Sequence, residues 1–477
     1  MRYKRTKIIA TVGPATASKD KLVELYAHGV NIVRFNFSHA DYVTARDIAN
    51  RIHELNSEGT TSLSLLLDTK GPELRTGDIE GKKTYVKGDT FRIYVGTKSE
   101  GNDLSCDYPY LVEDVEVGKM IEIDSGLFHV RVLEQGENFL VVEAMNDAII
   151  GSRRHVNLPG IRIRLPGITE KDKEDILFGI ENHFHFIAAS FIRTADNVRE
   201  IREFLDMNGG NGIRIISKIE NAEGVENLES IVLISDGVMV ARGDLGIEVP
   251  IEKVPKYQKK IVDLCRQNGK FVIVATHMLE SMIEHPFPTR AEVSDIFRAV
   301  LQGSDTTMLS GETTTGKYPI ESVDIMVSVI CEAEEELCNK HHEYSERGLT
   351  SRDIEKKAII RSALDIADSL HIKTLVLFTR SGLLARLAAA YRPNLVVYAF
   401  TPFDTSLGYM RSLYAIEPRI LSSYSMVHQQ NLLLAIRELV TEGKVDISER
   451  IIAVTDIQIG DKEIPVMEII NIGDITL

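Results

Sequence analysis

The stretch IRIISKIE at residues 213–220 shows the pattern on which the fold of this 477-residue chain is built. Its first five residues are mostly apolar, as expected for a short strand buried on both faces of a parallel sheet. Two charged residues, Lys218 and Glu220, follow directly. The segment at 221–234 then has the composition of a helix. This order of strand, charged residues and helix is typical of one βα unit.

The same unit recurs on both sides of this stretch. Further strands are predicted at 7–11, 32–37, 62–67, 186–191, 237–241, 271–276 and 306–309. Helices are predicted at 21–28, 44–57, 168–182, 195–206, 221–234, 255–268, 289–302 and near 320–337. Eight βα units are the number that closes a TIM (β/α)8 barrel, so the sequence predicts an α/β fold of this kind.

One segment interrupts this rhythm, from residue 72 to residue 166. Short stretches such as FRIYV at 91–95 and FHVRV at 128–132 alternate apolar and polar residues, and glycine-containing turns separate them. This pattern predicts a small antiparallel β domain, a β-barrel, inserted into the larger barrel. The catalytic barrel then comprises residues 1–71 and 167–343. Residues 344–477 alternate helices and strands again and are predicted to form a separate C-terminal α/β domain.

Composition limits the class of partner. The formal net charge is −15, which disfavours binding to nucleic acid or to an anionic membrane over a broad surface. Four cysteines without a CxxC motif indicate reduced thiols, and neither a signal peptide nor an apolar run long enough to span a membrane is found. We therefore expect a cytoplasmic protein in which any anionic ligand is bound by a local cluster of cations.

Polar residues follow most of the predicted barrel strands at their carboxyl ends, where TIM barrels have their active sites. One such residue alone can be a helix cap or a satisfied buried polar group. A whole set that converges on one barrel mouth indicates a functional site. The set comprises Arg34, Asn36, Ser38, Asp68, Thr69, Lys218, Glu220, Gly243, Asp244, Thr276, Ser310 and Glu312.

The types of these residues fit phosphoryl transfer. Glu220 and Asp244 follow neighbouring strands and can together bind Mg²⁺ through carboxylate oxygens. Lys218 lies two residues before Glu220, on the same side of the strand, where it can stabilise negative charge on an enolate or a phosphoryl group. Arg34 and Arg75 can neutralise phosphate oxygens. We therefore predict a magnesium-dependent phosphoryl-transfer enzyme.

Two further groups allow more than one interpretation. The oxygen-bearing residues Asn36, Ser38, Asp68 and Thr69 suit either a weakly charged cation or hydrogen bonds to a substrate. The pair Arg153-Arg154 is either a solvated charge pair or, on a mobile lid, a contact for nucleotide phosphates.

Seven segments in their order and spacing closely resemble the signature segments of the pyruvate kinase family, over residues 4–335. They are IVRFNFSH at 32–39, LDTKGPELRTG at 67–77, VNLPG at 156–160, SKIE at 217–220, MVARGDLGIE at 239–248, ATHMLESM at 275–282 and MLSGE at 308–312. The resemblance implies transfer of the phosphoryl group from phosphoenolpyruvate to ADP, giving pyruvate and ATP, at the last step of glycolysis. His277 and Ala40 depart from the family's usual Gln and Gly, without removing a functional group.

The same resemblance implies roles for individual residues. The residues involved in catalysis would be Lys218, Thr276, Arg34, Ser310 and Glu312. Of these, Thr276, Ser310 and Glu312 would lie near the site of enolate protonation. The substrate would contact Arg34, Lys218, Gly243, Asp244 and Thr276. The nucleotide would contact Pro14, Arg34, Asn36, His39, Arg75 and Arg153 or Arg154. Mg²⁺ or Mn²⁺ would bind Glu220 and Asp244, and K⁺ would bind Asn36, Ser38, Asp68 and Thr69.

Glu73 indicates whether the enzyme depends on a monovalent cation. In the family, Glu at this place accompanies dependence on potassium, and Lys replaces the ion in independent members. The resemblance therefore implies activation by K⁺.

The C-terminal domain departs further from the family pattern. Thr379, Arg380 and Ser381 lie in a turn that resembles the phosphate-binding turn of effector sites, but Leu383 and Leu384 follow where small or polar residues are common. An ordinary strand-to-helix turn and a site for a phosphorylated effector are both open interpretations. The family also implies a homotetramer.

Two other functions were weighed. Another barrel enzyme acting on phosphoenolpyruvate or pyruvate, such as an aldolase or lyase, would need neither Arg75 nor a 95-residue β lid. A non-catalytic effector-binding protein would not need Lys218, Glu220, Asp244 and Thr276 together.

Overall fold

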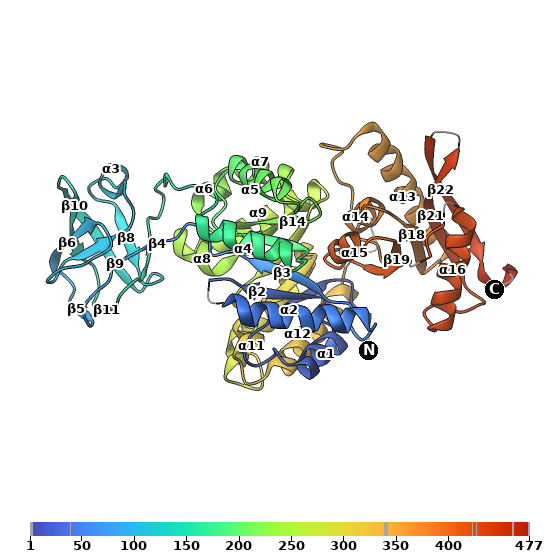
Figure 1. Ribbon diagram of the computed structural model, residues 1–477, viewed down its shortest axis with the longest axis horizontal. Helices are drawn as coiled ribbons and strands as arrows, with labels where there is room; N and C mark the ends of the chain where they lie inside the picture. Colours follow the sequence, from blue (N-terminus) through green and yellow to red (C-terminus); the bar gives the residue numbers. More distant parts are fainter. Residues whose placement is uncertain are drawn as a thin grey trace.

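Three bodies lie in a row in the computed structural model, which describes residues 3–38, 40–337, 342–421, 423–425, 427–459 and 462–475. Figure 1 shows the barrel in the middle, the inserted β domain at one end and the C-terminal domain at the other. The inserted domain (the lid below) and the C-terminal domain therefore lie against opposite ends of the barrel.

The central body is a closed barrel of eight parallel strands, in the order β1-β17-β16-β15-β14-β13-β3-β2. This confirms the predicted TIM fold. Every strand is made of buried residues over nearly its whole length, which is the cause of the apolar runs in the sequence. The strands are β1 (Lys7–Thr11), β2 (Ile32–Asn36), β3 (Ser64–Asp68), β13 (Phe186–Ala189), β14 (Arg214–Ile219), β15 (Gly237–Ala241), β16 (Phe271–Ala275) and β17 (Thr306–Leu309).

Helices cover the outside of the barrel. Thr169 and Asp172 form a capping box at the start of α4, with both of its hydrogen bonds present. The helix expected at 221–234 is instead two short helices, α6 and α7, that meet at Asn227. The α-helices are α1 (Lys19–His28), α2 (Tyr42–Ser57), α4 (Glu170–Glu181), α5 (Ala195–Met207), α6 (Ala222–Glu226), α7 (Leu228–Ile234), α8 (Arg242–Glu248), α9 (Val254–Gln267), α10 (Arg290–Gln302), α11 (Gly311–Thr314) and α12 (Pro319–Glu335); 3-10 turns are η1 (Ile251–Lys253) and η2 (Glu280–Ile283).

The lid contains a seven-stranded sheet in the order β4-β12-β8-β9-β10-β6-β7 and a two-stranded sheet of β11 and β5. A β-bridge between Thr76 and Cys106 joins the two edges of the larger sheet, which makes it barrel-like. Pairing is antiparallel as predicted, except that β6 and β7 are parallel. The elements are β4 (Leu74–Arg75), β5 (Lys83–Tyr85), β6 (Thr90–Val95), β7 (Leu104–Cys106), α3 (Leu111–Asp114), β8 (Met120–Ile123), β9 (Phe128–Gln135), β10 (Phe139–Ala144), β11 (Ala148–Ile150) and β12 (His155–Asn157).

The C-terminal domain has a five-stranded sheet in the order β20-β19-β18-β21-β22. Sequence patterns did not indicate α15 or β20. Strand β20 contains Pro418 and lies at the edge of the sheet. Proline has no backbone N–H, and an edge strand tolerates this because its outer side forms no hydrogen bonds with another strand. The elements are α13 (Ser351–Leu370), β18 (Thr374–Phe378), α14 (Leu383–Ala390), β19 (Val396–Thr401), α15 (Asp404–Met410), β20 (Ile416–Ile420), α16 (His428–Thr441), β21 (Arg450–Ile459), β22 (Lys462–Asn471) and the 3-10 turn η3 (Ile472–Asp474).

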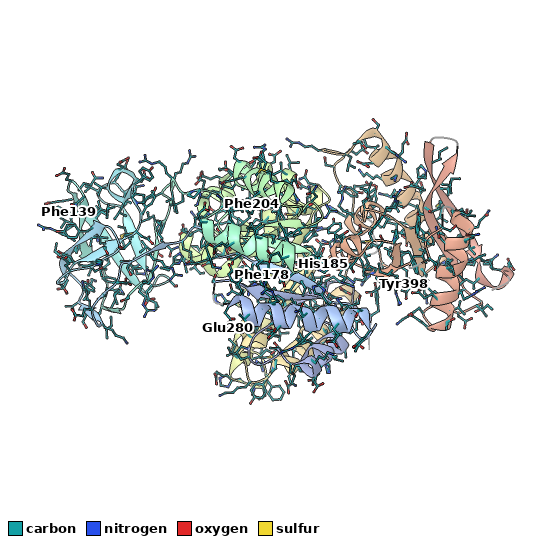
Figure 2. The ribbon with its side chains drawn as sticks, in the orientation of Figure 1. Phe139, Phe178, His185, Phe204, Glu280 and Tyr398 are labelled. Atoms are coloured by element: carbon teal, nitrogen blue, oxygen red, sulfur yellow. The ribbon has the colours of Figure 1, made fainter. Side chains whose placement is uncertain are left out.

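The C-terminal domain packs against the amino ends of the barrel strands. Ser64 at the start of β3 donates a hydrogen bond to the Gly408 carbonyl, with an Oγ–O distance of 2.8 Å. The Phe271 and Tyr409 rings lie with their centroids 6.1 Å apart. Figure 2 shows His185 at this junction, where it packs so closely on Gly408 that no Cβ would fit there. The carboxyl ends of the strands are therefore left to the lid side.

Among the helices of the described residues, none is both long enough and apolar enough to cross a membrane.

Candidate active site

Lys218 is the centre of a buried polar cluster at the carboxyl ends of the barrel strands. Its Nζ donates hydrogen bonds to Asp68 Oδ1 at 2.9 Å and to Ser190 Oγ at 2.7 Å, and lies 2.9 Å from Glu220 Oε1. Burial alone lowers the pKa of Lys218, but the charges of Asp68 and Glu220 outweigh it and raise this pKa above its ordinary value. The residue is therefore held as a cation.

Asp68 links Lys218 to Arg34. Arg34 on β2 donates from Nε to Asp68 Oδ2 at 2.6 Å and from Nη1 to Thr11 Oγ1 at 2.9 Å. Burial tends to raise the pKa of Asp68, yet the neighbouring Lys218 and Arg34 hold this pKa below its ordinary value. The side chain of Asp68 is thus an anion between two cations. This arrangement fixes both cations in place at the barrel mouth.

Glu220 is fully buried next to Lys218. Its Oε2 accepts a hydrogen bond from the Phe191 backbone N–H at 2.6 Å, whereas Oε1 accepts none and meets only the ionic contact with Lys218. Burial raises the pKa of Glu220 to about 7, opposed by Lys218 and reinforced by Asp244. The Phe191 backbone has a φ of 55°, which is rare for a residue with a bulky side chain. Its strained conformation directs the N–H at Glu220.

Asp244 follows the next strand along the barrel and lies in the first turn of α8. Its side chain makes no hydrogen bond or ion pair with any other residue that the structure describes. The neighbouring Gly243 N–H donates to Thr276 Oγ1 at 2.8 Å. Thr276 and His277 have φ values of 65° and 52°, so the turn after β16 is also strained. Strain at two strand ends supports a functional role for this mouth.

The donor set fits a hard divalent cation. Glu220 Oε1 is a buried carboxylate oxygen without a hydrogen-bond donor, and Asp244 adds a second carboxylate from the adjacent strand. Within the described ranges, no group of three or more His, Cys, Asp or Glu side chains could hold a metal ion. Two carboxylates completed by ligand and water oxygens are the usual protein share of a Mg²⁺ site.

Ser310 and Glu312 lie on the other side of the mouth, after β17. Glu312 is buried, and its two carboxylate oxygens accept backbone hydrogen bonds from Leu279 at 2.9 Å and Ser310 at 2.7 Å. Burial raises the pKa of Glu312. The Ser310 hydroxyl is buried without a hydrogen-bond partner. Glu312 thus positions the turn that holds the Ser310 hydroxyl.

A pocket of about 500 Å³ opens beside this cluster, between β1, β2 and α11. Pro14, Arg34 and Asn36, all expected to contact a nucleotide, line it. Ser310 lines it as well, and Arg34, which donates to Asp68, joins the pocket to the Lys218 cluster. His39, expected in the same group, lies outside the described residues.

The lid arginines lie apart from this pocket. Arg75 donates from Nε to Glu73 Oε2 at 2.9 Å and from Nη1 to the Arg153 carbonyl at 2.8 Å. Arg153 and Arg154 are exposed, and Arg154 makes a long contact with Asp124 at 3.4 Å. The structure therefore does not bring these three arginines together with Pro14 and Asn36.

The residues expected to bind a monovalent cation lie at the ends of β2 and β3. Asn36 and Asp68 are direct neighbours in the register of these strands. Asn36 Oδ1 accepts from the Ser38 N–H at 3.3 Å, and Thr69 Oγ1 accepts from the Ser190 N–H at 3.2 Å. These side chains share one corner of the mouth.

Sequence reasoning missed Ser190 and Phe191. Ser190 accepts the shortest hydrogen bond of Lys218 and donates to the Thr69 carbonyl at 2.7 Å. It directly follows β13, the fourth barrel strand, as the other site residues follow theirs. The position of Ser190 at a strand end was the signal that could have revealed it. The role of Phe191 depends on its backbone conformation, which leaves no signal in the sequence.

In the C-terminal domain, Thr379, Arg380 and Ser381 line a pocket of about 490 Å³. Lys356 and His428 also line it, and both are paired with carboxylates, Asp456 and Glu468 respectively. For brevity we call it the 379–381 pocket.

Comparison with known proteins gave consistent matches. A family model described as pyruvate kinase, barrel domain, matches residues 3–323, and one described as pyruvate kinase, alpha/beta domain, matches residues 357–470. The pyruvate kinase of Clostridium perfringens is 40% identical over 407 residues, covering 84% of this chain and 85% of the relative. That of Geobacillus stearothermophilus is 42% identical over 404 residues, covering 83% and 68%. A solved pyruvate kinase structure from Cryptosporidium parvum superimposes with a TM-score of 0.89 at 33% identity, covering 98% of this chain and 96% of that chain.

Proposed function

The chain belongs to the pyruvate kinase family, enzymes that transfer the phosphoryl group of phosphoenolpyruvate to ADP, and we propose that the cluster around Lys218 is where this chain does so. The observation that supports this location is a permanently charged lysine held against two buried carboxylates at the barrel mouth. The mouth is also where the lid and the adjoining pocket meet the strand ends.

Lys218 stabilises the negative charge that develops during transfer. Its raised pKa keeps it protonated, and Asp68, Ser190 and Glu220 fix its position before substrate arrives. A preorganised cation in a buried site stabilises the transition state more than a mobile one in water. Arg34, held by Asp68 from the other side, faces the phosphoryl group with its remaining donors.

Glu220 and Asp244 are the residues that would hold Mg²⁺ or Mn²⁺. The family uses a divalent metal ion and K⁺. A bound divalent cation supplies positive charge against phosphate and enolate oxygens. Glu220 offers Oε1, whose one contact among the described residues is the ionic one with Lys218, and the raised pKa of Glu220 reflects the burial of this carboxylate.

Substrate carboxylate and enolate are positioned by the strained turn after β16. Gly243 and Asp244 at the start of α8 and Thr276 after β16 lie together, as the Gly243–Thr276 hydrogen bond shows. The hydroxyls of Thr276 and Ser310 form the side of the mouth from which the enolate is protonated, with Glu312 orienting Ser310. The unpartnered Ser310 hydroxyl is free to bind a water that delivers the proton.

The nucleotide occupies the pocket lined by Pro14, Arg34 and Asn36. Arg75 and one of Arg153 and Arg154 contact its phosphates when the lid closes, because all three are carried by the lid; Arg75 is half-buried, and Arg153 and Arg154 are exposed. His39 belongs to the same proposal. K⁺ binds among Asn36, Ser38, Asp68 and Thr69, with Glu73 as the marker of this dependence.

The 379–381 pocket is proposed as an effector site. Thr379, Arg380 and Ser381 offer hydroxyl and guanidinium donors to a phosphate, beside Lys356. We expect AMP or a sugar phosphate to change turnover, and an Arg380→Gln variant to lose this response. We also propose a homotetramer, which sedimentation of the full chain tests directly.

A lactate-dehydrogenase-coupled assay with phosphoenolpyruvate, ADP, Mg²⁺ and K⁺ tests the function. Pyruvate formation that requires ADP is expected. Pyruvate formed without ADP would indicate an aldolase- or lyase-type barrel, and no pyruvate at all would indicate a non-catalytic protein.

A further inference from the structure

A second cluster of cations lies far from the mouth, at the junction between the barrel and the C-terminal domain. It surrounds a pocket of about 340 Å³. Arg214 at the start of β14 and Lys270 just before β16 come from the barrel, and Arg386 comes from α14. In Figure 1, α14 lies on the side of its domain that faces the barrel. We call this cavity the junction pocket.

Positive charge exceeds negative charge in the junction pocket. Four cationic side chains line it, the fourth being the exposed Arg347, against the single carboxylate of Asp236. That carboxylate is already used, because it pairs with Arg202 at 3.0 Å and with Arg214 at 3.2 Å. Arg347 pairs with Glu229 outside the cavity.

Lys270 and Arg386 are the uncompensated members. Lys270 Nζ donates to the Ser235 carbonyl at 2.7 Å, and Arg386 Nη1 makes a long contact with the Gly269 carbonyl at 3.5 Å. Neither pairs with a carboxylate among the residues that the structure describes. Burial and the nearby Arg386 lower the pKa of Lys270, and the Asp236 carboxylate offsets this only in part.

Such a cluster is unfavourable unless an anion joins it. Half-buried like charges repel each other more strongly than charges in water. A chain of net charge −15 also has many carboxylates, so a cation without a carboxylate partner is unusual in it. The cavity is far larger than a single water requires. Its wall also includes Asn268, whose amide can bond polar groups of a ligand.

We propose that the junction pocket binds a small, multiply charged oxyanion, a phosphorylated or polycarboxylated metabolite, between Arg214, Lys270 and Arg386. This site is distinct from the 379–381 pocket. The two cavities share Ser381 and Leu383 in their walls, but the cations of the 379–381 pocket are Lys356 and Arg380. Ligands of the two sites can therefore be separated by mutation.

Calorimetric titration of the full chain with glycerol 3-phosphate and, separately, with citrate tests the proposal. The Arg386→Gln variant should bind at least one of these probes about tenfold or more weakly than wild type, because a charged donor is lost. Arg386→Lys should keep most of the affinity. Arg380→Gln removes only binding at the 379–381 pocket and should keep the Arg386-dependent affinity, and the matched control Arg437→Gln on the exposed face of α16 should bind like wild type. The probe with the Arg386-dependent affinity identifies the phosphate or the carboxylate class.

Three results would overturn the proposal: wild type that binds neither probe, Arg386→Gln that binds both as wild type does, or Arg380→Gln that shows the same loss as Arg386→Gln. If Arg386→Gln does not fold, crystals of the wild-type chain soaked in selenate test whether the junction pocket binds an anion. An anomalous peak between Lys270 and Arg386 is then expected, and its absence contradicts the site.

Discussion

At the residue scale, Lys218 has the most demanding environment in the molecule. It is buried, yet it remains charged because two carboxylates and a serine hydroxyl surround it. We expect Lys218→Met to lower kcat by about 10²–10³-fold or more, since a preorganised charge is removed from the transition state. The coupled assay measures this.

The fold should survive this change. Asp68 keeps its hydrogen bond from Arg34, and Glu220 can take up a proton, because burial already raises its pKa to about 7. Circular dichroism should therefore resemble that of wild type, and Mg²⁺ should still bind, with release of the proton from Glu220. Lys256→Met on the exposed surface of α9 is the matched control and should keep full turnover. Substantial activity in Lys218→Met would remove Lys218 from its proposed role.

The second prediction at this scale concerns Glu73. Its carboxylate pairs with Arg75 and lies 3.8 Å from Lys70 Nζ, near the proposed K⁺ site. At saturating Mg²⁺, turnover should be several-fold to many-fold higher with K⁺ than without it. In Glu73→Lys, the ammonium group should replace the ion, so turnover should no longer respond to K⁺.

Steady-state rates in K⁺ and in a bulky organic cation at equal ionic strength measure this response. Glu80→Lys makes the same charge change at an exposed position of the lid and should leave K⁺ activation intact. Equal turnover of wild type with and without K⁺ would contradict the prediction.

At the scale of elements, one buried hydrogen bond joins the lid to the barrel. Asn157 on β12 donates from Nδ2 to Glu248 Oε1 at the end of α8, at 2.5 Å. Burial, together with the charges of Glu122 and Asp244, raises the pKa of Glu248 to about 7, against the effect of the Asn157 hydrogen bond. The strand that returns from the lid is thus fixed to the helix that presents Asp244.

This contact predicts a dependence of stability on pH. Between its ordinary pKa of 4.5 and about 7, Glu248 binds a proton in the folded chain that it has lost in the unfolded chain. The free energy of unfolding therefore falls as the pH rises through this window. Gln has no such proton to lose, and its carbonyl can still accept from Asn157. Glu248→Gln should become more stable than wild type by on the order of 1–3 kcal/mol at about pH 8, with a much smaller gap at about pH 5.

Melting temperatures across this pH range provide the measurement. Glu252→Gln, an exposed change in the turn that follows α8, serves as the control and should track wild type at every pH. A constant difference between Glu248→Gln and wild type would show that the buried carboxylate does not titrate in this window.

At the scale of the whole molecule, Arg411 connects the C-terminal domain to the barrel. It is buried and donates to the Leu63 carbonyl at 3.0 Å and to the Ser62 hydroxyl at 3.0 Å, beside the start of β3. Arg411→Leu removes both hydrogen bonds and leaves the Leu63 carbonyl with Asn56 as its donor, so we expect a loss of on the order of 1–3 kcal/mol in unfolding free energy.

Limited proteolysis at the junction and thermal unfolding test this prediction. Arg411→Leu should melt earlier and be cut faster between the two domains, whereas Arg437→Leu on exposed α16 should behave like wild type. Unchanged melting and cleavage would mean that the other contacts, such as Phe271 with Tyr409 and Ser64 with the Gly408 carbonyl, hold the junction without Arg411.

Local patterns were sufficient for most of the fold. Strands β1, β15 and β17 have the bounds that their apolar runs predicted, because a strand buried on both faces tolerates little else. The short helix α15 and the edge strand β20 could not be predicted. Residues Ser406–Met410 of α15 are buried next to the barrel, and β20 is a mostly half-buried strand that pairs with β19, so neither segment has an amphipathic pattern of its own.

The sequence by itself determined the barrel, the family and the set of polar residues at the strand ends, since period and spacing are local properties of a chain. Only the tertiary structure decided which of these residues touch. It placed Ser190 and the strained Phe191 N–H in the cluster, and it left Glu220 Oε1 without a donor. It also brought Lys270 and Arg386, more than a hundred residues apart, to one cavity. Contacts of this kind depend on how separate elements pack, and no local pattern records that.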